Sequence, residues 1–518
     1  MDSRSGWMVG RARNRLSAWV WLVAASGGWL ACAAAAGQAP KELPEEAPVI
    51  RSSTRLVVLD VVVTDSHGRA VRGLKGEDFS VLEDGVEQKV ASFEAPASRG
   101  GPGGGHGSGV ARAEAGERSI PAHNILVLDE LNTEVLDEAY ARQSIEKYLR
   151  KHGPVLNEPT SLLIVGQKNL EFAHDYTRDA AALKIALHGH HPALPFFLET
   201  GGAYGAVERL SKTLWVLKQI ASANLHYAGR KNVIWVGSGF PELTLESIAA
   251  QDREQFKGVI RDMAGVLFDA RVAVYTINPQ GLQVSPAIYE DTFGDLTTGE
   301  LIFEGIAEQT GGRIVRLRNE IDEAIAETMD DGASYYTLTY YPANHDWNGK
   351  FRALRVSVKG QPVKVRARRG YYALAESPLT GGEIDAAVSQ ALMSPLPYRA
   401  LDVQASVTRA EDASGKYTLL VNPNGLEWAT LASGQRRCEI SVVTATVGVG
   451  AQFSTHRVRL LESVVDAPQF RKIFNKPVTF TFVAELPGDT HLVKVVARDS
   501  ANGNIGTAEI AKDAIRLR

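Results

Sequence analysis

The sequence predicts a multidomain protein in which a doubly wound α/β domain is flanked by β-rich modules. Between residues 120 and 333, buried-type strands alternate with amphipathic helices, which implies a mostly parallel sheet covered on both faces. On either side, short β-branched runs are separated by turn residues, the pattern of all-β modules. The length of 518 residues also exceeds what one hydrophobic core supports, so two or three domains are expected.

Composition and charge narrow the class of protein. Hydrophobic residues make up 44% of the chain and charged residues 22%, which is a globular composition. The net charge is -4, and residues 1–36 carry four Arg and one Asp, so their removal would leave -4 - 3 = -7. Such a mildly acidic surface gives no electrostatic reason to expect nucleic acid or anionic lipid as a partner.

The N-terminus indicates export. Four arginines precede an apolar run from Leu16 to Ala36 that ends in small residues, which is the order of a secretory signal. The chain is therefore expected in the periplasm, on the cell surface or outside the cell. A single uncleaved membrane anchor is the competing interpretation, because the run approaches the length of a spanning helix.

The two cysteines add one possibility. Cys32 follows Trp29-Leu30-Ala31 at the end of the apolar run, where a lipid could be attached, and membrane contact is expected only through such an anchor. Cys438 lies in a predicted strand and is interpreted as a buried small hydrophobic residue. Without Cys32 the mature chain can form no internal disulfide, so its stability must come from core burial.

The chain divides into seven segments. In order these are a signal peptide (1–36), a Pro- and Glu-rich tether (37–50), an N-terminal β module (51–97), a Gly-rich linker (98–119), the α/β domain (120–333), β strands completing the N-terminal module (334–375) and a C-terminal β-sandwich (383–518). If the strands after the α/β domain complete the first module, that domain is an insertion between two halves of one β structure.

Each segment has its own local signals. The N-terminal module begins with the strand Leu56–Thr64 and contains a hairpin turn at Glu83-Asp84-Gly85. In the α/β domain, Asn319 is expected to cap a final helix that ends at Gly332. Its predicted strands are 124–128, 161–165, 232–236, 271–277 and 313–317, and its most periodic helix contains Val207, Leu210, Leu214, Leu217 and Ala221.

The last strand before residue 375 carries a row of cations. Lys364, Arg366 and Arg368 alternate with apolar residues, and Arg369 follows. The row is interpreted either as a contact surface for an acidic partner or as the solvated side of an edge strand. After it, the helix 384–393 leads into strands near 401–408, 416–421, 437–447, 451–461, 477–485 and 491–498, which favour an immunoglobulin-like β-sandwich that acts as a spacer or adhesive module.

As a set, several phrases resemble the von Willebrand factor A-like family, specifically the subgroup described mainly from acidobacteria. The phrases are Leu56–Asp65, Asn124–Asp129, Asn232–Pro241, and the closing segment from Ala333-Ser334-Tyr335-Tyr336 to Arg369-Gly370-Tyr371-Tyr372, so the resemblance covers roughly residues 50 to 375. It implies a fold that binds ligands at the carboxyl ends of its strands.

The resemblance also implies a metal site. The wider family binds Mg²⁺ through an Asp-x-Ser-x-Ser motif, a loop Thr and a second Asp, which suits an ion that leaves one position for a partner's carboxylate. Here Asp129 and Thr133 match, but Leu131 replaces a Ser, Ala203 replaces the Thr and Ser238 replaces the Asp. We therefore expect a degenerate site of Asp129, Thr133 and Ser238 that holds Mg²⁺ or no cofactor; alternatively, Asp129 and Thr133 cap the first helix and tie down its loop.

Other candidate chemistry is weaker. Gly237-Ser238-Gly239 lacks the Gly-x-Ser-x-Gly spacing of a nucleophile elbow. His188, His190 and His191 could bind Zn²⁺ or Cu²⁺, but no Glu or Cys lies beside them at a known spacing, which favours solvated loop histidines. No nucleotide-binding motif occurs.

Two function classes remain. The first is an exported, non-enzymatic protein that mediates protein–protein or surface interactions, with a protein or another cell-envelope macromolecule as its partner. The alternative is a metal-dependent enzyme, or enzyme subunit, of the cell envelope. A convergent set of titratable groups in one pocket would favour the enzyme, and the sequence shows none. A purely structural envelope protein is a third, weaker option.

Overall fold

A computed structural model describes residues 55–96, 120–167, 170–191, 203–239, 250–280, 303–316, 318–375, 379–410, 414–448, 453–473 and 476–517. The predicted signal peptide, tether and Gly-rich linker, with Cys32, lie outside these residues. Within the described part of the chain, no helix is both long enough and apolar enough to cross a membrane.

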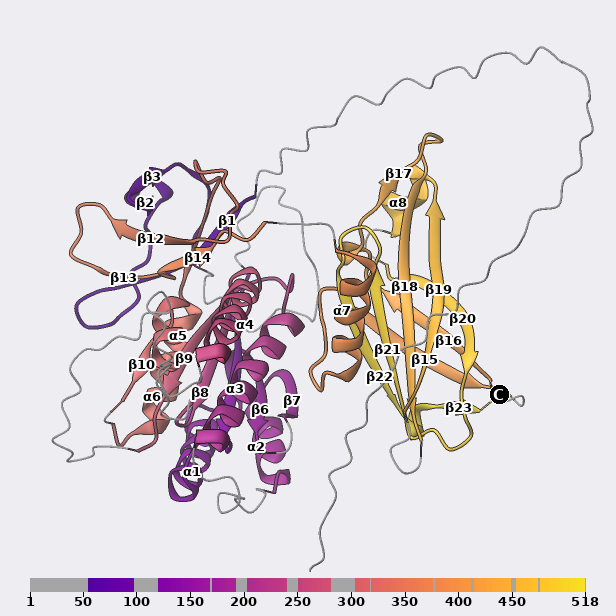
Figure 1. The fold of residues 1–518 in the computed structure, drawn as a ribbon, viewed down its shortest axis with the longest axis horizontal. Helices are drawn as coiled ribbons and strands as arrows, with labels where there is room; N and C mark the ends of the chain where they lie inside the picture. The colour runs from indigo at the N-terminus through magenta and orange to yellow at the C-terminus, as the bar shows by residue number, and fades with distance from the viewer. Residues whose placement is uncertain are drawn as a thin grey trace, which may run out of the picture. The chain divides into compact units, whose positions relative to one another are not determined.

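The centre of the α/β domain is a six-stranded sheet with the order β10-β9-β8-β5-β6-β7 (Figure 1). All neighbours are parallel except β7, which pairs antiparallel with β6 at the edge. Every residue of β5, β8 and β9 is buried, as the continuous apolar sequences of these strands require. The strands are β5 His123–Asp129, β6 Val155–Val165, β7 Leu170–Asp179, β8 Lys231–Val236, β9 Val272–Ile277 and β10 Ile314–Val315.

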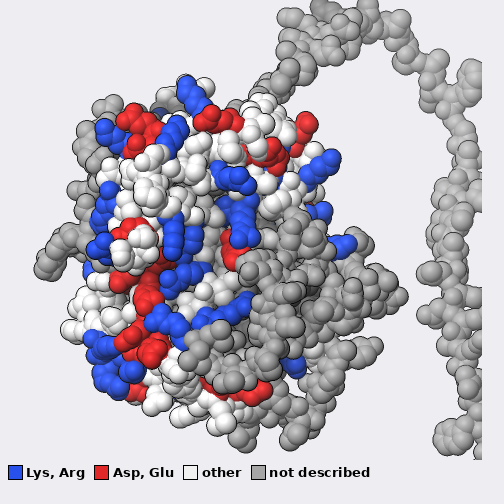
Figure 2. Space-filling model, turned by 90° about the vertical axis from the view of Figure 1, so that its left-hand side faces the viewer, with Lys and Arg blue, Asp and Glu red and all other residues white. Residues whose placement is uncertain are grey.

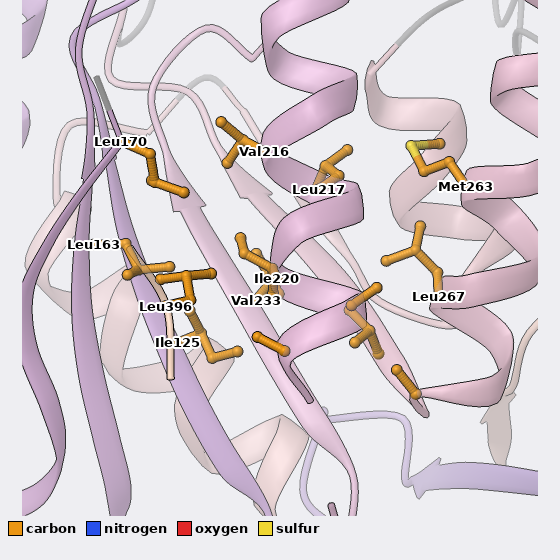
Figure 3. Close-up of a cluster of buried hydrophobic side chains, with 14 of the residues drawn as sticks. Ile125, Leu163, Leu170, Val216, Leu217, Ile220, Val233, Met263, Leu267 and Leu396 are labelled. Carbon is orange, nitrogen blue, oxygen red and sulfur yellow. The ribbon is translucent and has the colours of Figure 1, made fainter. Parts of the chain in front are cut away.

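Helices cover both faces of this sheet, with a separate hydrophobic core on each. Helices α3, α4 and α5 contribute to one core and α1, α2 and α6 to the other. Figure 3 shows the first core, in which Ile220 of α3 lies beside Val233 of the sheet and Leu217 of α3 is directed toward Met263 and Leu267 of α4. The helices are α1 Val135–Lys151, α2 Ala180–Gly189, α3 Ala203–Ala223, α4 Ala250–Asp269, α5 Phe303–Gln309 and α6 Ile321–Ala333.

Strands from before and after the α/β domain pair with one another. One sheet has the order β13-β1-β11-β4 and a second the order β14-β12-β2-β3, and both contribute to one hydrophobic core. We call these two sheets the β module. Its strands are β1 Val57–Thr64, β2 Phe79–Glu83, β3 Val86–Gln88, β4 Val90–Glu94, β11 Tyr336–Tyr340, β12 Phe351–Val358, β13 Lys364–Arg366 and β14 Gly370–Tyr372.

The hairpin between β2 and β3 turns at Asp84 and Gly85. Both residues have positive φ angles, 49° and 83°, as a two-residue turn of type I′ requires. Because the turn residues set the register of the hairpin, Glu83 is placed opposite Val86 and its side chain is directed into the core of the module.

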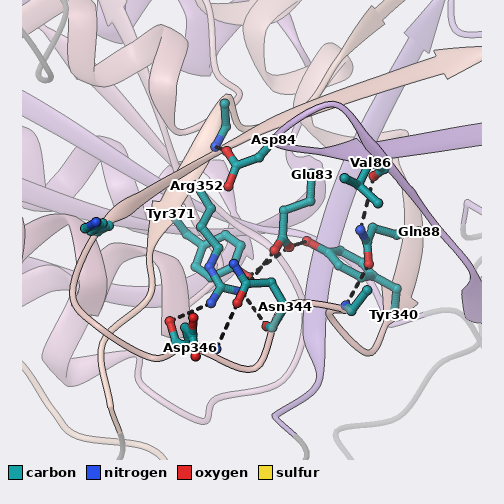
Figure 4. Close-up of polar contacts among 12 residues, drawn as sticks. Glu83, Asp84, Val86, Gln88, Tyr340, Asn344, Asp346, Arg352 and Tyr371 are labelled. Atoms are coloured by element: carbon teal, nitrogen blue, oxygen red, sulfur yellow. Dashed lines mark hydrogen bonds and ion pairs between the residues drawn. The ribbon is translucent and has the colours of Figure 1, made fainter.

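Glu83 and Arg352 form a buried ion pair in the β module (Figure 4). The Arg352 Nη1 atom lies 3.0 Å from Glu83 Oε1, and the two side chains are 3% and 2% exposed. Hydroxyl groups of Tyr340 and Tyr371 donate to Glu83 Oε2 at 2.6 and 2.9 Å. The carboxylate is therefore compensated by one cation and two hydroxyls, which a buried charge needs.

The C-terminal part contains α7, Gly381–Met393, followed by two further sheets. Thr380 and Glu383 form a capping box at the start of α7. One sheet has the order β20-β16-β15-β23, the other β17-β18-β21-β22 with β19 beside β18, and both contribute to one core. The elements are β15 Val403–Arg409, β16 Ser414–Val421, β17 Ala429–Thr430, β18 Arg436–Val447, β19 Phe453–Val465, α8 Ala467–Ile473, β20 Val478–Glu485, β21 Leu492–Asp499, β22 Ile505–Ala511 and β23 Arg516–Leu517.

Two local features differ from the sequence analysis. The residue that precedes α6 is Glu320 rather than Asn319, and its side chain makes no capping hydrogen bond. The acidic residues Asp322 and Glu323 lie in the first turn instead, where they interact favourably with the helix dipole. Strand β7 was not expected, because an edge strand that is half exposed lacks the continuous apolar pattern of its neighbours.

Candidate functional site

The candidate site lies at the carboxyl edge of the central sheet, where β5 ends at Asp129 and β8 at Val236. These strands are adjacent and parallel, so the loops that follow them meet at the same edge. Asp129 has no exposed surface and Thr133 is 2% exposed. The structure therefore brings together Asp129, Thr133 and the Gly237-Ser238-Gly239 loop, the three parts proposed from the sequence.

The Asp129 carboxylate accepts four hydrogen bonds from within the protein. Its Oδ1 atom accepts from the backbone N–H groups of Leu131 and Asn132, each at 3.0 Å. Its Oδ2 atom accepts from the Trp235 indole Nε1–H at 3.0 Å and from the Gly239 N–H at 2.9 Å. Four donors use the hydrogen-bonding capacity of a carboxylate, so Asp129 is fully engaged internally.

Thr133 and Asn132 join the same two loops. The Ser238 backbone N–H donates to Thr133 Oγ1 at 3.0 Å. The Asn132 side-chain amide donates to Gly239 O and to Thr213 Oγ1 on α3. We call Asp129, Asn132, Thr133 and Trp235, together with the backbone of residues 237–239, the Asp129 latch. Ser238 takes part through its backbone.

Gly237 lets the loops approach this closely. Its φ angle is 149°, and a Cβ atom added there would lie 2.4 Å from Asp129 Cβ and 2.5 Å from Thr133 Oγ1. Any side chain would therefore force the two loops apart.

Burial raises the pKa of the Asp129 carboxyl, and the hydrogen bonds from Trp235 and the backbone N–H groups act in the opposite direction. All four partners are N–H donors, so protonation of the carboxyl would leave one of them without its acceptor. The four N–H donors therefore favour the anionic form of Asp129, whereas burial, which is the larger effect on its pKa, disfavours it.

These residues do not fit a Mg²⁺ ion. Magnesium requires oxygen ligands in near-ideal octahedral geometry at about 2.1 Å. Both Asp129 oxygens already accept two N–H groups each, and the indole of Trp235 can only donate. Ser238 lacks the carboxylate of the family pattern. Of the loop matched to the family's Thr, Gly201 and Gly202 lie outside the described residues, and Ala203 begins α3.

The sequence interpretation missed Trp235 and Asn132. Trp235 is fully buried, and a buried indole N–H usually finds an acceptor. A tryptophan in an otherwise aliphatic strand, directly before Gly-Ser-Gly, was the available signal. The acceptor could not be read from the sequence, because Asp129 is 106 positions away.

The three histidines do not converge on one point. His190 lies between two carboxylates, with Nδ1 2.7 Å from Glu171 and Nε2 3.0 Å from Glu130. His188 lies 3.3 Å from Glu146, and His191 is exposed. The expectation of solvated histidines is thus wrong for His190, whose side chain is 11% exposed. Within the described ranges, no group of three or more His, Cys, Asp or Glu residues is arranged to hold a metal ion.

Comparisons with known proteins give structural likenesses of low score. No protein-family model matches the chain, and no curated protein matches it. It is similar to the crystal structure of the SpRpn10 VWA domain, with 14% identity, a TM-score of 0.23, and coverage of 41% of this chain and 98% of that one. It is also similar to the vWF domain of the type V pili tip protein Mfa5 from Porphyromonas gingivalis, with 15% identity and a TM-score of 0.17.

The second likeness covers 26% of this chain and 44% of the Mfa5 chain. The first of the two solved structures is a VWA domain and the second a vWF domain. The acidobacterial subgroup and the immunoglobulin-like character of the C-terminal part stay predictions.

Proposed function

We propose that this chain is an exported, non-enzymatic protein that binds other proteins at the carboxyl edge of its α/β domain without a divalent metal. The observation that carries the proposal is the Asp129 latch, in which four N–H groups occupy the carboxylate. Because these four donors belong to the protein itself, they link the loop after β5 to the loop after β8 without a bound ion. A rigid edge loses less conformational entropy when a partner binds.

An apolar side chain is exposed close to the latch. Helix α1 begins two residues after Thr133, and its first residues, Val135 and Leu136, are 51% and 84% exposed. Leu136 is the most exposed large hydrophobic side chain in the described part of the chain. Apolar anchors of this kind contribute strongly to binding when a partner removes them from water.

The distribution of charge favours a protein partner over a nucleic acid. On the face shown in Figure 2, Lys and Arg residues are interspersed with Asp and Glu, and the whole chain has a net charge of -4. Nucleic-acid binding generally requires a basic patch or stripe.

The remaining parts of the proposal rest on the sequence. The Arg-rich start and the apolar run to Ala36 support export, and Cys32 supports a possible lipid anchor. Membership of the acidobacterial-type subgroup is part of the same proposal. The C-terminal sheets are proposed to form an immunoglobulin-like sandwich that acts as a spacer or second adhesive module.

One observation favours the alternative of an envelope enzyme. His190 is held between Glu130 and Glu171, which is a geometry found in acid–base catalysis. However, Arg142 also binds Glu130 at 2.6 Å, so this carboxylate is already neutralised by a cation. A simpler explanation is structural: the contacts of His190 with Glu130 and Glu171 connect β7, the end of α2 and the loop after β5.

The proposal is tested by replacing Leu136 with aspartate. Surface cross-linking of the native envelope fraction, followed by mass spectrometry in the presence of EDTA, compares the wild type with Leu136→Asp. We expect the amount of each protein captured by the wild type to fall at least tenfold in the variant. A tenfold loss corresponds to about 1.4 kcal/mol of binding free energy.

The control is Ile185→Asp, because Ile185 lies on α2 and is 70% exposed. This variant should capture the same proteins as the wild type. Equal capture by all three proteins, or capture that requires added Mg²⁺, would contradict the proposal.

A further inference from the structure

Three arginines and one aspartate lie together where the β module meets the α/β domain. Asp60 is on β1, Arg368 follows β13, Arg230 immediately precedes β8, and Arg271 immediately precedes β9. We call these four residues the arginine cluster. It lies at the amino ends of the parallel strands, the edge of the sheet opposite the Asp129 latch. Asp60, Arg230 and Arg368 are 9%, 2% and 9% exposed.

Arg271 forms an ion pair with the Asp60 carboxylate. Its Nε atom donates to Asp60 Oδ2 at 3.1 Å, and its Nη2 atom contacts Asp60 Oδ1. The Thr337 hydroxyl lies 3.2 Å from the same Oδ1. In this bidentate ion pair, Arg271 neutralises Asp60, which is the one carboxylate of the cluster.

Arg230 is held mainly by neutral oxygens. Its guanidinium donates to Asn232 Oδ1 at 2.9 Å, to the Gly311 carbonyl at 3.0 Å and to the Tyr275 hydroxyl at 3.2 Å. Its Nη1 atom also lies 3.4 Å from the backbone carbonyl of Asp60. These contacts satisfy its donors, but none of them is with a carboxylate, so the buried positive charge is balanced only at longer range by the carboxylates of Asp60 and Asp331.

Arg368 has no oxygen partner among the described residues. Its guanidinium lies over the ring of Phe268, 4.5 Å from the centroid. Two carboxylates nearby are paired elsewhere, Asp331 with Arg366 and Asp269 with Arg55. Burial, together with Arg230 and Arg271, lowers the pKa of Arg368 to about 10. The cluster therefore holds three cations against one carboxylate.

All four residues line one small cavity, of about 10 Å³, which is close to the space of one water-sized particle. Val58, Val272, Ala273 and Thr310 complete the lining. Buried cations are generally paired with an anion, and this cavity is too small for phosphate or an organic acid. We propose that it binds one small inorganic anion, with chloride as its ordinary ligand, between Arg368 and the other two arginines.

Such an anion would join the two parts of the molecule. Asp60 and Arg368 belong to the β module, whereas Arg230 and Arg271 belong to the α/β domain. The two backbones already touch at this place, because a Cβ on Gly311 would lie 2.8 Å from Arg368 N. The Arg369 N–H also donates to the Gln309 carbonyl at 3.1 Å. Bound chloride would add charge compensation to this contact, so the stability of the assembly should depend on chloride.

The site also corrects the interpretation of the basic row in the sequence. Arg368 is buried, Arg366 binds Asp331 and Arg369 lies 2.6 Å from Glu308, so three of the four cations face the α/β domain. Lys364 is exposed, and Arg369 is also 58% exposed although it contacts Glu308. Because three of its four cations contact the α/β domain or are buried against it, the row is not a solvated edge. It is also not a free surface for an acidic partner.

The experiment compares thermal unfolding of the full chain in sodium chloride and in sodium gluconate at equal ionic strength. We expect chloride to raise the midpoint of the wild type by about 2–4 °C at concentrations well above its dissociation constant. The variant Arg368→Gln should lose more than half of this difference. The control Arg355→Gln, an exposed arginine on β12, should retain it.

A direct measurement does not depend on a variant that folds. Crystals of the wild-type chain grown in bromide should show an anomalous difference peak in the cavity between Arg368 and Arg230. A cavity that contains only water, without an anomalous peak, would overturn the proposal. An identical chloride effect in the wild type, Arg368→Gln and Arg355→Gln would also overturn it, as would the absence of any effect in the wild type.

Discussion

Asp129→Asn is expected to lower the free energy of unfolding by about 2–4 kcal/mol, although the substitution hardly changes the shape of the side chain. The new amide keeps one accepting oxygen but places an NH₂ group against two of the four N–H donors that Asp129 now binds. Those two buried N–H donors would then face the NH₂ group and would lack an acceptor. Urea denaturation followed by tryptophan fluorescence measures the change.

Two further variants serve as comparisons for the stability of Asp129→Asn. Trp235→Phe removes the indole N–H but keeps an aromatic ring, so it should cost less, about 1–2 kcal/mol including the lost ring volume. The control Asp262→Asn changes an exposed carboxylate on α4 and should stay within about 0.5 kcal/mol of the wild type. An Asp129→Asn protein as stable as this control would show that the Asp129 latch does not hold the two loops.

Arg352→Met should destabilise the β module by about 3–5 kcal/mol, because Glu83 would be left buried without its cation. The hydroxyls of Tyr340 and Tyr371 would still donate to Glu83, but they carry no charge. The matched control is Arg355→Met on the same strand, where the side chain is exposed. That control should change the unfolding free energy by less than about 0.5 kcal/mol.

The double variant Glu83→Met with Arg352→Met separates charge from packing. Since removal of both partners leaves no buried charge, it should recover most of the stability lost in Arg352→Met. Double-mutant analysis of the urea transitions gives the coupling between the two residues. Additive losses in the double variant would mean that the ion pair contributes little beyond the volume of its side chains.

Much of the fold could be predicted because its signals are local. Strands β5 and β8 are continuous apolar runs, and α3 repeats its apolar residues at helical spacing, so their types follow from periodicity alone. The Asp84-Gly85 turn likewise needs only two residues to set its geometry. Strand β22 follows the last strand for which a range was predicted, and its mixed burial pattern gave no such signal.

The candidate site could be predicted only in part, because its contacts join distant positions. The sequence places Asp129 and Ser238 at the ends of two predicted strands, and the structure shows that these strands are neighbours and brings their loops together. What occupies the Asp129 carboxylate depends on the orientation of Trp235, which periodicity does not encode. Arg368 was misread for the same reason: alternation along a strand shows two faces but not which face another domain covers.

Calorimetric titration of Mg²⁺, Mn²⁺ and Ca²⁺ into the metal-stripped full chain, beside Asp129→Asn, would decide whether the Asp129 latch replaces a metal. Because the four N–H donors occupy the carboxylate, we expect no saturable heat of binding from any of the three ions in either protein. Saturable heat in the wild type that disappears in Asp129→Asn would show that the latch opens for a cation, and would restore a metal-bridged mode of binding.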